Sequence, residues 1–136
     1  MTDVTPDEAF RLLFMGSQEA IGTEDGGCVR LGDDMTSRLY DEAFTLHLEG
    51  DNPIGAYPIF LTGDGWRVSW GCVDFDEGDF DSWIHAQNLR NILDRYSIRA
   101  WVERSRSKGY HVWVFGAATV SAETMRHALF YACELV

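Results

Sequence analysis

Long apolar runs, CxxC pairs and internal repeats are all missing from this sequence of 136 residues. No run approaches the roughly 18 apolar residues of a membrane-spanning helix, which argues against a transmembrane protein. The three cysteines, Cys28, Cys72 and Cys133, are odd in number and far apart, so they predict reduced thiols. The acidic start, MTDVTPDEAF, is unlike a signal peptide. We therefore expect a cytoplasmic protein with no membrane partner.

Basic residues are also scarce, because 11 Lys and Arg face 22 Asp and Glu, for a formal net charge of -11. Spread evenly, this charge would argue against a simple basic nucleic-acid binder. The charge is uneven, however: residues 1–94 hold 19 acids and 5 bases, whereas residues 95–136 hold 3 acids and 6 bases. The asymmetry indicates either two surfaces, one for cations and one for anions, or simply a solvated basic hairpin.

The sequence predicts one domain, residues 1–136, with enough apolar residues (46%) to bury a core. The pattern predicts an α-rich N-terminal region at residues 1–54 and the main core at residues 55–136. The elements expected up to residue 76 are a helix from Pro6 that stops at Gly16, a short strand at 28–31, a helix around 39–48, and two strands, 57–61 and 66–76, joined by a turn.

The second half of the sequence has a more regular pattern of apolar residues. Helical spacing covers residues 80–96, two alternating runs lie at 98–103 and 110–115, and Ser121 is placed to cap a last helix. From residue 66 the order is therefore β-α-β-β-α. This order predicts an α+β fold, a ferredoxin-like or RNA-recognition-motif-like core that lacks its last strand, with an N-terminal helical and hairpin extension.

Two carboxylates, Asp74 and Asp76, end the strand 66–76. Because side chains alternate along a strand, both point to the same face of the sheet. Two carboxylates on one face can share a hard cation such as Mg²⁺. Aspartates are also common where a strand runs into a turn and a helix begins, so the residues alone leave both interpretations open.

Other protein classes that use paired aspartates fit this segment poorly. A calcium loop of the EF-hand type that began at Asp74 would need Gly at its sixth position and Glu at its twelfth, where this chain has Asp79 and His85. Haloacid-dehalogenase-type phosphatases usually follow DxD with Gly-Thr or Gly-Val, and nucleotide-sugar glycosyltransferases are usually longer chains. We therefore do not favour these three classes.

A basic turn, residues 104–109, precedes a strand that carries His111. Small residues let a phosphate approach the backbone, and Arg and Lys supply charge-assisted hydrogen bonds to it. His111 could donate to a phosphate oxygen, or it could be a core histidine satisfied by the backbone. In the expected topology the first and third strands are adjacent and antiparallel, which brings His111 to the carboxylates. Carboxylates for a divalent ion beside donors for phosphate are typical of a nucleotidyl-transfer site.

At these residues the sequence resembles the archaeo-eukaryotic primase superfamily, especially primase-polymerase domains of the phage and plasmid type. Gly71-Cys-Val-Asp74-Phe-Asp76 matches the family's hhhDhD motif, and Gly109-Tyr110-His111 matches its small-x-His motif. The resemblance covers roughly residues 55–136. The family's third motif, an acid on a final strand, has no good match, because Glu134 lies in an expected helix. We therefore expect either an N-terminal fragment of a longer enzyme or a naturally short, inactive relative.

The resemblance implies metal-dependent, template-directed nucleotidyl transfer, as in a DNA primase or polymerase. Asp74 and Asp76 would hold Mg²⁺ or Mn²⁺, and His111 would complete the catalytic set. The implied partners are nucleoside triphosphates, a single-stranded DNA template and a fused or associated helicase. The residues expected to bind phosphate are Arg104, Ser105, Arg106, Ser107, Lys108 and His111.

Two alternatives keep these residues but change the chemistry. A catalytically inactive module of the RNA-recognition type would bind single strands or nucleotides without metal, by stacking on Tyr110, Trp113 or Trp70. A DxD phosphatase, which we favour less, would hydrolyse small phosphate esters without a template effect. Dependence on a divalent metal separates the first alternative from nucleotidyl transfer.

Overall fold

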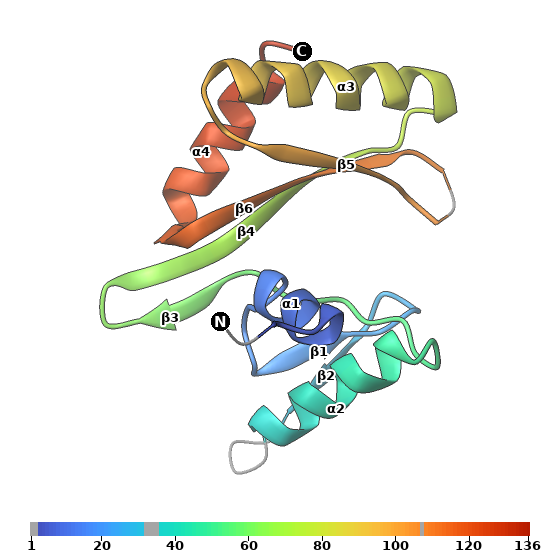
Figure 1. Cartoon of the computed structure of the whole chain (residues 1–136), viewed down its shortest axis with the longest axis vertical. Coiled ribbons are helices and arrows are strands. Elements are labelled where there is room, and N and C mark those ends of the chain that lie inside the picture. Colours follow the sequence, from blue (N-terminus) through green and yellow to red (C-terminus); the bar gives the residue numbers. More distant parts are fainter. Residues whose placement is uncertain (1–2, 32–35, 107) are drawn as a thin grey trace. The chain divides into compact units, whose positions relative to one another are not determined.

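The computed structural model describes residues 3–31, 36–106 and 108–136 (Figure 1). The chain divides into two compact units, Met1–Gly63 and Asp64–Val136. Each unit has a hydrophobic core of its own. Ser107, which the sequence predicts to bind phosphate, lies outside the described residues.

The first unit combines short strands with two helices. Its elements are α1 (Pro6–Leu13), β1 (Ala20–Gly22), β2 (Cys28–Arg30), α2 (Thr36–Leu48) and β3 (Phe60–Thr62). Helix α1 begins at the expected capping box, in which Thr5 and Glu8 each bond the other's backbone N–H. The sequence did not predict β1, because a three-residue strand that includes a glycine is too short to show alternation.

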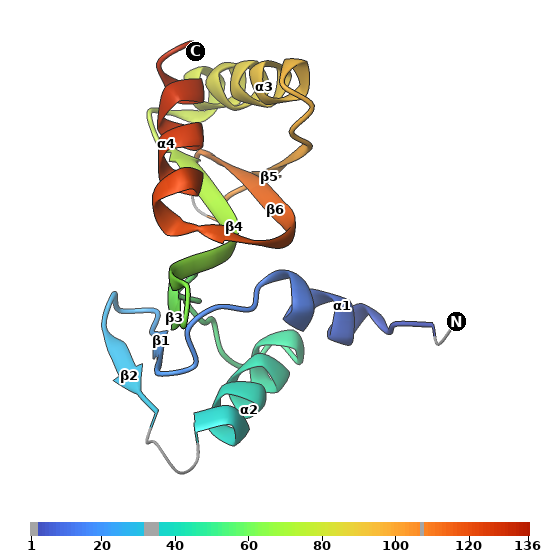
Figure 2. The same cartoon turned by 90° about the vertical axis from the view of Figure 1, so that its left-hand side faces the viewer.

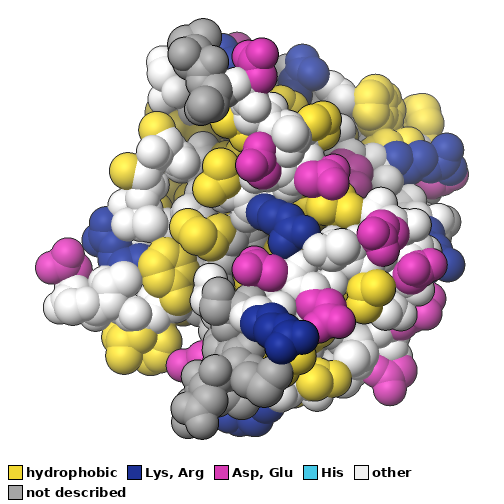
Figure 3. All heavy atoms as spheres, turned by 60° about the horizontal axis from the view of Figure 1, so that its bottom comes forward, with side chains coloured by type: hydrophobic (Ala, Val, Ile, Leu, Met, Phe, Trp, Pro, Cys, Tyr) yellow, Lys and Arg dark blue, Asp and Glu magenta, His cyan; other side chains and the backbone are white. Residues whose placement is uncertain are grey.

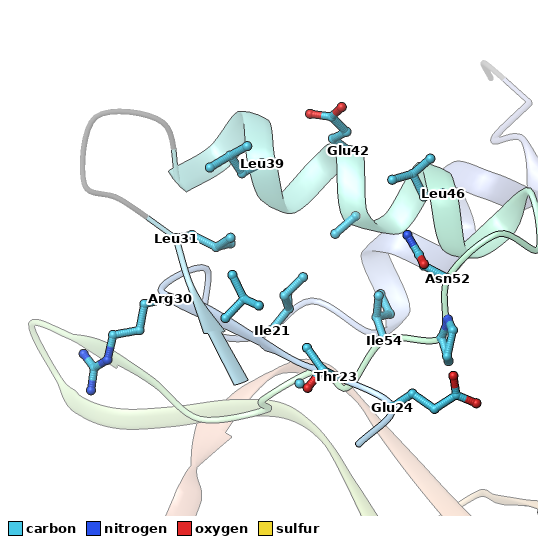
Figure 4. A pocket seen from close by; sticks show the side chains of 14 residues that line it. Ile21, Thr23, Glu24, Arg30, Leu31, Leu39, Glu42, Leu46, Asn52 and Ile54 are labelled. Carbon is cyan, nitrogen blue, oxygen red and sulfur yellow. The ribbon is translucent and has the colours of Figure 1, made fainter. Parts of the chain in front are cut away.

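A cavity of about 550 Å³ lies between the β1–β2 hairpin and α2. Ile21, Leu31 and Ile54 line it with apolar surface, whereas the charged ends of Arg30 and Glu42 point outward (Figure 4). The unit's buried core, around Tyr40 and Phe44, is made by the same elements. Among the described residues, those that the sequence predicts to be functional do not line this cavity.

The second unit has the predicted β-α-β-β-α order. Its elements are β4 (Gly65–Phe75), α3 (Asp79–Arg95), β5 (Ala100–Arg104), β6 (Tyr110–Ser121) and α4 (Ala122–Cys133). Strands β4 and β5 each pair with β6 in the antiparallel direction, so β6 lies between them. The α+β fold and the adjacency of the first and third strands of this core are therefore confirmed.

Helices α3 and α4 pack together on one face of this sheet (Figures 1 and 2). Leu89 and Leu93 of α3 and Leu129 of α4 are buried there against Val112 and Val114 of β6. Because side chains alternate along β6, Trp113 between these valines and His111 before them point to the opposite face. Helices α3 and α4 therefore cover one face of the sheet, and the alternate residues of the strands lie on the other face.

Strand β6 is interrupted by a bulge. Val68 of β4 pairs with Val120, and Trp70 pairs with Phe115, so two steps along β4 correspond to five along β6. The bulge, residues 116–119, is attached to β4 by Arg67, whose Nη2 donates to the Thr119 carbonyl oxygen at 2.6 Å. Strand β6 therefore continues past residue 115, where the sequence-based strand ended.

Charged residues of both signs reach the surface. On the face drawn in Figure 3, acidic and basic side chains lie among hydrophobic ones. Among the helices in the described part of the chain, none combines the length and the hydropathy that crossing a membrane requires.

Candidate functional site

The structure brings Asp74 and His111 together as direct partners on β4 and β6. The His111 Nε2 atom lies 3.6 Å from Asp74 Oδ1. Their neighbours Val73 and Val112 belong to the core under the helices, so Asp74 and His111 point to the face away from the helices. Asp74 is well exposed, whereas the His111 side chain is only 29% exposed.

Asp76 lies one residue beyond the end of β4, beside the start of β6. Its Oδ2 is 3.8 Å from Lys108 Nζ, and both side chains are more than half exposed. Gly109 lets the backbone at the start of β6 come close to the end of β4, because a Cβ at Gly109 would lie only 2.1 Å from the Phe75 carbonyl oxygen. Its φ of +86° also favours glycine. Steric contact and backbone conformation thus explain why the first residue of the small-x-His motif is a glycine here.

The other residues of the basic turn serve different contacts. Arg104 ends β5, and its Nη2 donates to Asp79 Oδ2 at 3.0 Å, in the first turn of α3. Ser105 closes the turn, since its N–H donates to the Gly109 carbonyl oxygen at 3.1 Å and its hydroxyl donates to the Lys108 carbonyl oxygen. Arg106 is exposed. Lys108, which is also predicted to bind phosphate, has its side chain beside Asp76.

Glu103 is a site residue that the sequence analysis did not single out. It pairs directly with His111 across β5 and β6, and its Oε2 lies 3.1 Å from His111 Nδ1. The same oxygen accepts a hydrogen bond from Trp113 Nε1 at 2.7 Å. His111 therefore lies between two carboxylates, Asp74 at Nε2 and Glu103 at Nδ1. The signal that could have found Glu103 is the register of the β5–β6 hairpin.

Cys72 lies on the same strand as Asp74, two residues earlier, and is directly opposite Trp113. Burial, together with the negative charges of Asp74 and Glu103, raises the pKa of its thiol to about 12. Cys72 is therefore a neutral thiol at physiological pH, which makes it a poor nucleophile.

Aromatic rings continue the site along β6. The Trp113 ring contacts the His111 ring edge-on, with centroids 5.6 Å apart, and it stacks on Phe115 at 6.4 Å. Trp101 of β5 contacts Phe115 and is 48% exposed. The two other rings predicted to stack on bases are Tyr110, which belongs to the core under the helices, and Trp70, which is buried.

The donor set at this face fits a hard divalent ion that takes only part of its ligands from protein. Within the described residues, no three His, Cys, Asp or Glu side chains are grouped so as to hold a metal on their own. Asp74 and Asp76 nevertheless offer exposed carboxylate oxygens at neighbouring places. Mg²⁺ is commonly bound by one or two carboxylates, with waters and substrate phosphates as the remaining ligands.

Comparison with known proteins gives a family for the chain. The sequence model of the family described as "TOTE conflict system, Archaeo-Eukaryotic Primase domain" matches residues 15–134. A search of curated proteins gave no significant match. The matched range begins well before residue 55, where the resemblance in the sequence started, and it includes Asp74, Asp76 and His111. The chain therefore belongs to the archaeo-eukaryotic primase domain family of TOTE conflict systems.

Proposed function

We propose that this domain carries out metal-dependent nucleotidyl transfer of the primase type, from nucleoside triphosphates and on a single-stranded DNA template. The observation that carries the proposal is the direct pairing of Asp74 with His111, at 3.6 Å, on one face of the sheet. Family membership supports the reaction class. The DNA template, the preference for Mg²⁺ or Mn²⁺ and an associated helicase are proposed from the family resemblance.

Asp74 and Asp76 are the residues that would hold the divalent ion. A bound Mg²⁺ or Mn²⁺ supplies positive charge that neutralises the triphosphate and activates the attacking 3′-hydroxyl. The exposure of both carboxylates leaves room for water and phosphate oxygens around them. Two carboxylates of like charge at one place favour a cation there.

His111 and Lys108 are the residues that would bind the triphosphate. The Nε2 atom of His111 is on the Asp74 side of the ring, so a phosphate held next to Asp74 is within its reach. Lys108 provides a mobile ammonium group beside Asp76. These two side chains orient the phosphates and offset their charge, whereas Arg104 is engaged with Asp79.

Nucleotide binding to the intact chain tests this proposal. We expect Asp74→Asn to weaken Mn²⁺-dependent binding of labelled ATP or dATP by more than about 100-fold, since loss of an outer-shell partner alone costs about 10–100-fold. Asp94→Asn is the matched control, because it removes the same charge from an exposed position near the end of α3. Equal binding by the Asp74→Asn and Asp94→Asn proteins would contradict the proposal.

A second candidate function is metal-independent binding of single-stranded nucleic acid. The aromatic row Trp113, Phe115 and Trp101 on the site face favours it, since base stacking on such rings contributes about 1–3 kcal/mol per base. This function predicts that an oligonucleotide quenches tryptophan fluorescence equally well with Mn²⁺ or with EDTA. Quenching that requires Mn²⁺ would instead support the first proposal.

A further inference from the structure

Glu103 is an exposed acid of β5 whose side chain contacts the neighbouring strand β6. One of its carboxylate oxygens serves two side chains of the neighbouring strand, His111 at 3.1 Å and Trp113 at 2.7 Å. The backbone places all three correctly, because Glu103 is directly opposite His111 and Trp113 follows two residues later on the same face. The arrangement therefore follows from the sheet register.

The direction of each hydrogen bond is fixed by chemistry. The indole N–H of Trp113 can only donate, and an ionised carboxylate can only accept. His111 Nδ1 must therefore carry the hydrogen in its contact with Glu103. The Trp113 ring packs edge-on against the imidazole of His111, at an interplanar angle of 83°, and this contact restricts rotation of the imidazole. With Nδ1 engaged, Nε2 is the nitrogen left on the Asp74 side.

We propose that Glu103 is a positioning residue: it accepts the Nδ1–H of His111 and so holds the ring with Nε2 facing the nucleotide bound at Asp74, where the imidazolium form donates its Nε2–H to a phosphate oxygen. This inference rests on the proposed function of the site, and it assigns a role to a residue outside both family motifs. A partner on one ring nitrogen is the usual means by which proteins select which nitrogen of a histidine faces a ligand.

Nitrogen-detected NMR of His111 tests the first half of the proposal without any nucleotide. At about pH 8, where a neutral imidazole shows its tautomer, we expect the native chain to carry the proton on Nδ1. Glu103→Ala should shift His111 toward the Nε2-protonated form, which free histidine prefers. Trp113→Phe is the matched variant, because it removes the other donor to Glu103 and should leave the tautomer unchanged. An unchanged tautomer in Glu103→Ala overturns the proposal.

Nucleotide binding tests the second half. We expect Glu103→Ala to weaken Mn²⁺-dependent ATP binding by about 10-fold or more, as loss of an outer-shell partner does, and Glu103→Gln to recover part of the loss through its amide oxygen. Adding Glu103→Ala to His111→Ala should cause no further loss, because both act through one ring. The control Glu123→Ala removes the same charge from the first turn of α4 and should bind like the native chain.

The two proposals fail in different ways. If His111→Ala weakens binding and Glu103→Ala does not, Glu103 has no positioning role, although the proposed function survives. If Asp74→Asn and His111→Ala both bind nucleotide normally, the proposed function fails and with it the role of Glu103 toward phosphate. The tautomer measurement then still decides whether Glu103 orients the ring.

Discussion

Replacing Gly109 by alanine tests whether the glycine of the small-x-His motif is required by the backbone. Two costs add at this position. A residue with a Cβ at a φ of +86° costs about 1–2 kcal/mol. The new Cβ would also lie 2.1 Å from the Phe75 carbonyl oxygen, so β4 and β6 must move apart, at the cost of overpacking, about 1–3 kcal/mol. We expect a total of about 2–5 kcal/mol.

Gly65→Ala is the matched control, because Gly65 has a similar φ of +95° but nothing within 4 Å of its added Cβ. It should lose only the conformational cost, about 1–2 kcal/mol. Urea unfolding followed by circular dichroism measures both variants. With an m-value of about 2 kcal/mol/M, Gly109→Ala should lower the midpoint by about 1–2.5 M. If Gly109→Ala is no less stable than Gly65→Ala, the steric explanation of the motif is refuted.

Two further variants concern the same unit. Ser121→Ala removes the hydroxyl that accepts from the Thr124 N–H at 3.0 Å, and it should lower the free energy of unfolding by about 1 kcal/mol. Ser121→Asp can still cap the helix and should keep most of the native stability. Equal urea midpoints for the native chain and both variants would contradict this. Cys72, with its pKa raised from 9.0 to about 12, should react with iodoacetamide more slowly at neutral pH than the exposed Cys28. Because the unfolded thiol ionises near 9.0 while the folded one stays protonated, the native chain should lose stability as pH rises from 9 toward 12, and Cys72→Ser should lose less. A pH-stability slope that is the same in both proteins would argue against the raised pKa.

The order of elements in the second unit could be predicted because its helices and strands are long enough to show a period. The 17-residue helix α3 and the 11-residue strand β4 each repeat their apolar pattern several times. Strand β6 was expected to end at residue 115, because the bulge at 116–119 breaks the alternation there. The three-residue strand β1 has too few residues for any pattern.

The Asp74–His111 contact could be predicted because topology alone makes β4 and β6 neighbours. Glu103 could not, because the face of a strand residue depends on the hairpin register. The first expected strand ends at Glu103 and the second begins at Tyr110. This hairpin would make Glu103 and Tyr110 partners and place Glu103 under the helices. In the structure Arg104 is the partner of Tyr110, so Glu103 moves to the face of His111. A shift of one residue moves every side chain of a strand to the other face.

The same shift in register explains why Arg104 does not lie on the face of His111. Its place on β5 alternates with Glu103, so it points to the side of Val102 and α3, where it bonds Asp79. Composition and spacing place a basic residue in the turn, but they do not say on which side of the sheet its guanidinium lies. Lys108 and Arg104, close in sequence, consequently belong to different surroundings.

The bulge in β6 has a consequence for comparing this chain with its relatives. It divides the ladder into a part that fixes His111 against Asp74 and a part that leads into α4. Because the two parts are paired to β4 separately, the number of residues between them is not set by the site. Insertions and deletions in related chains should therefore gather at positions 116–119. An alignment that forced a constant spacing from His111 to the last helix would misplace one or the other.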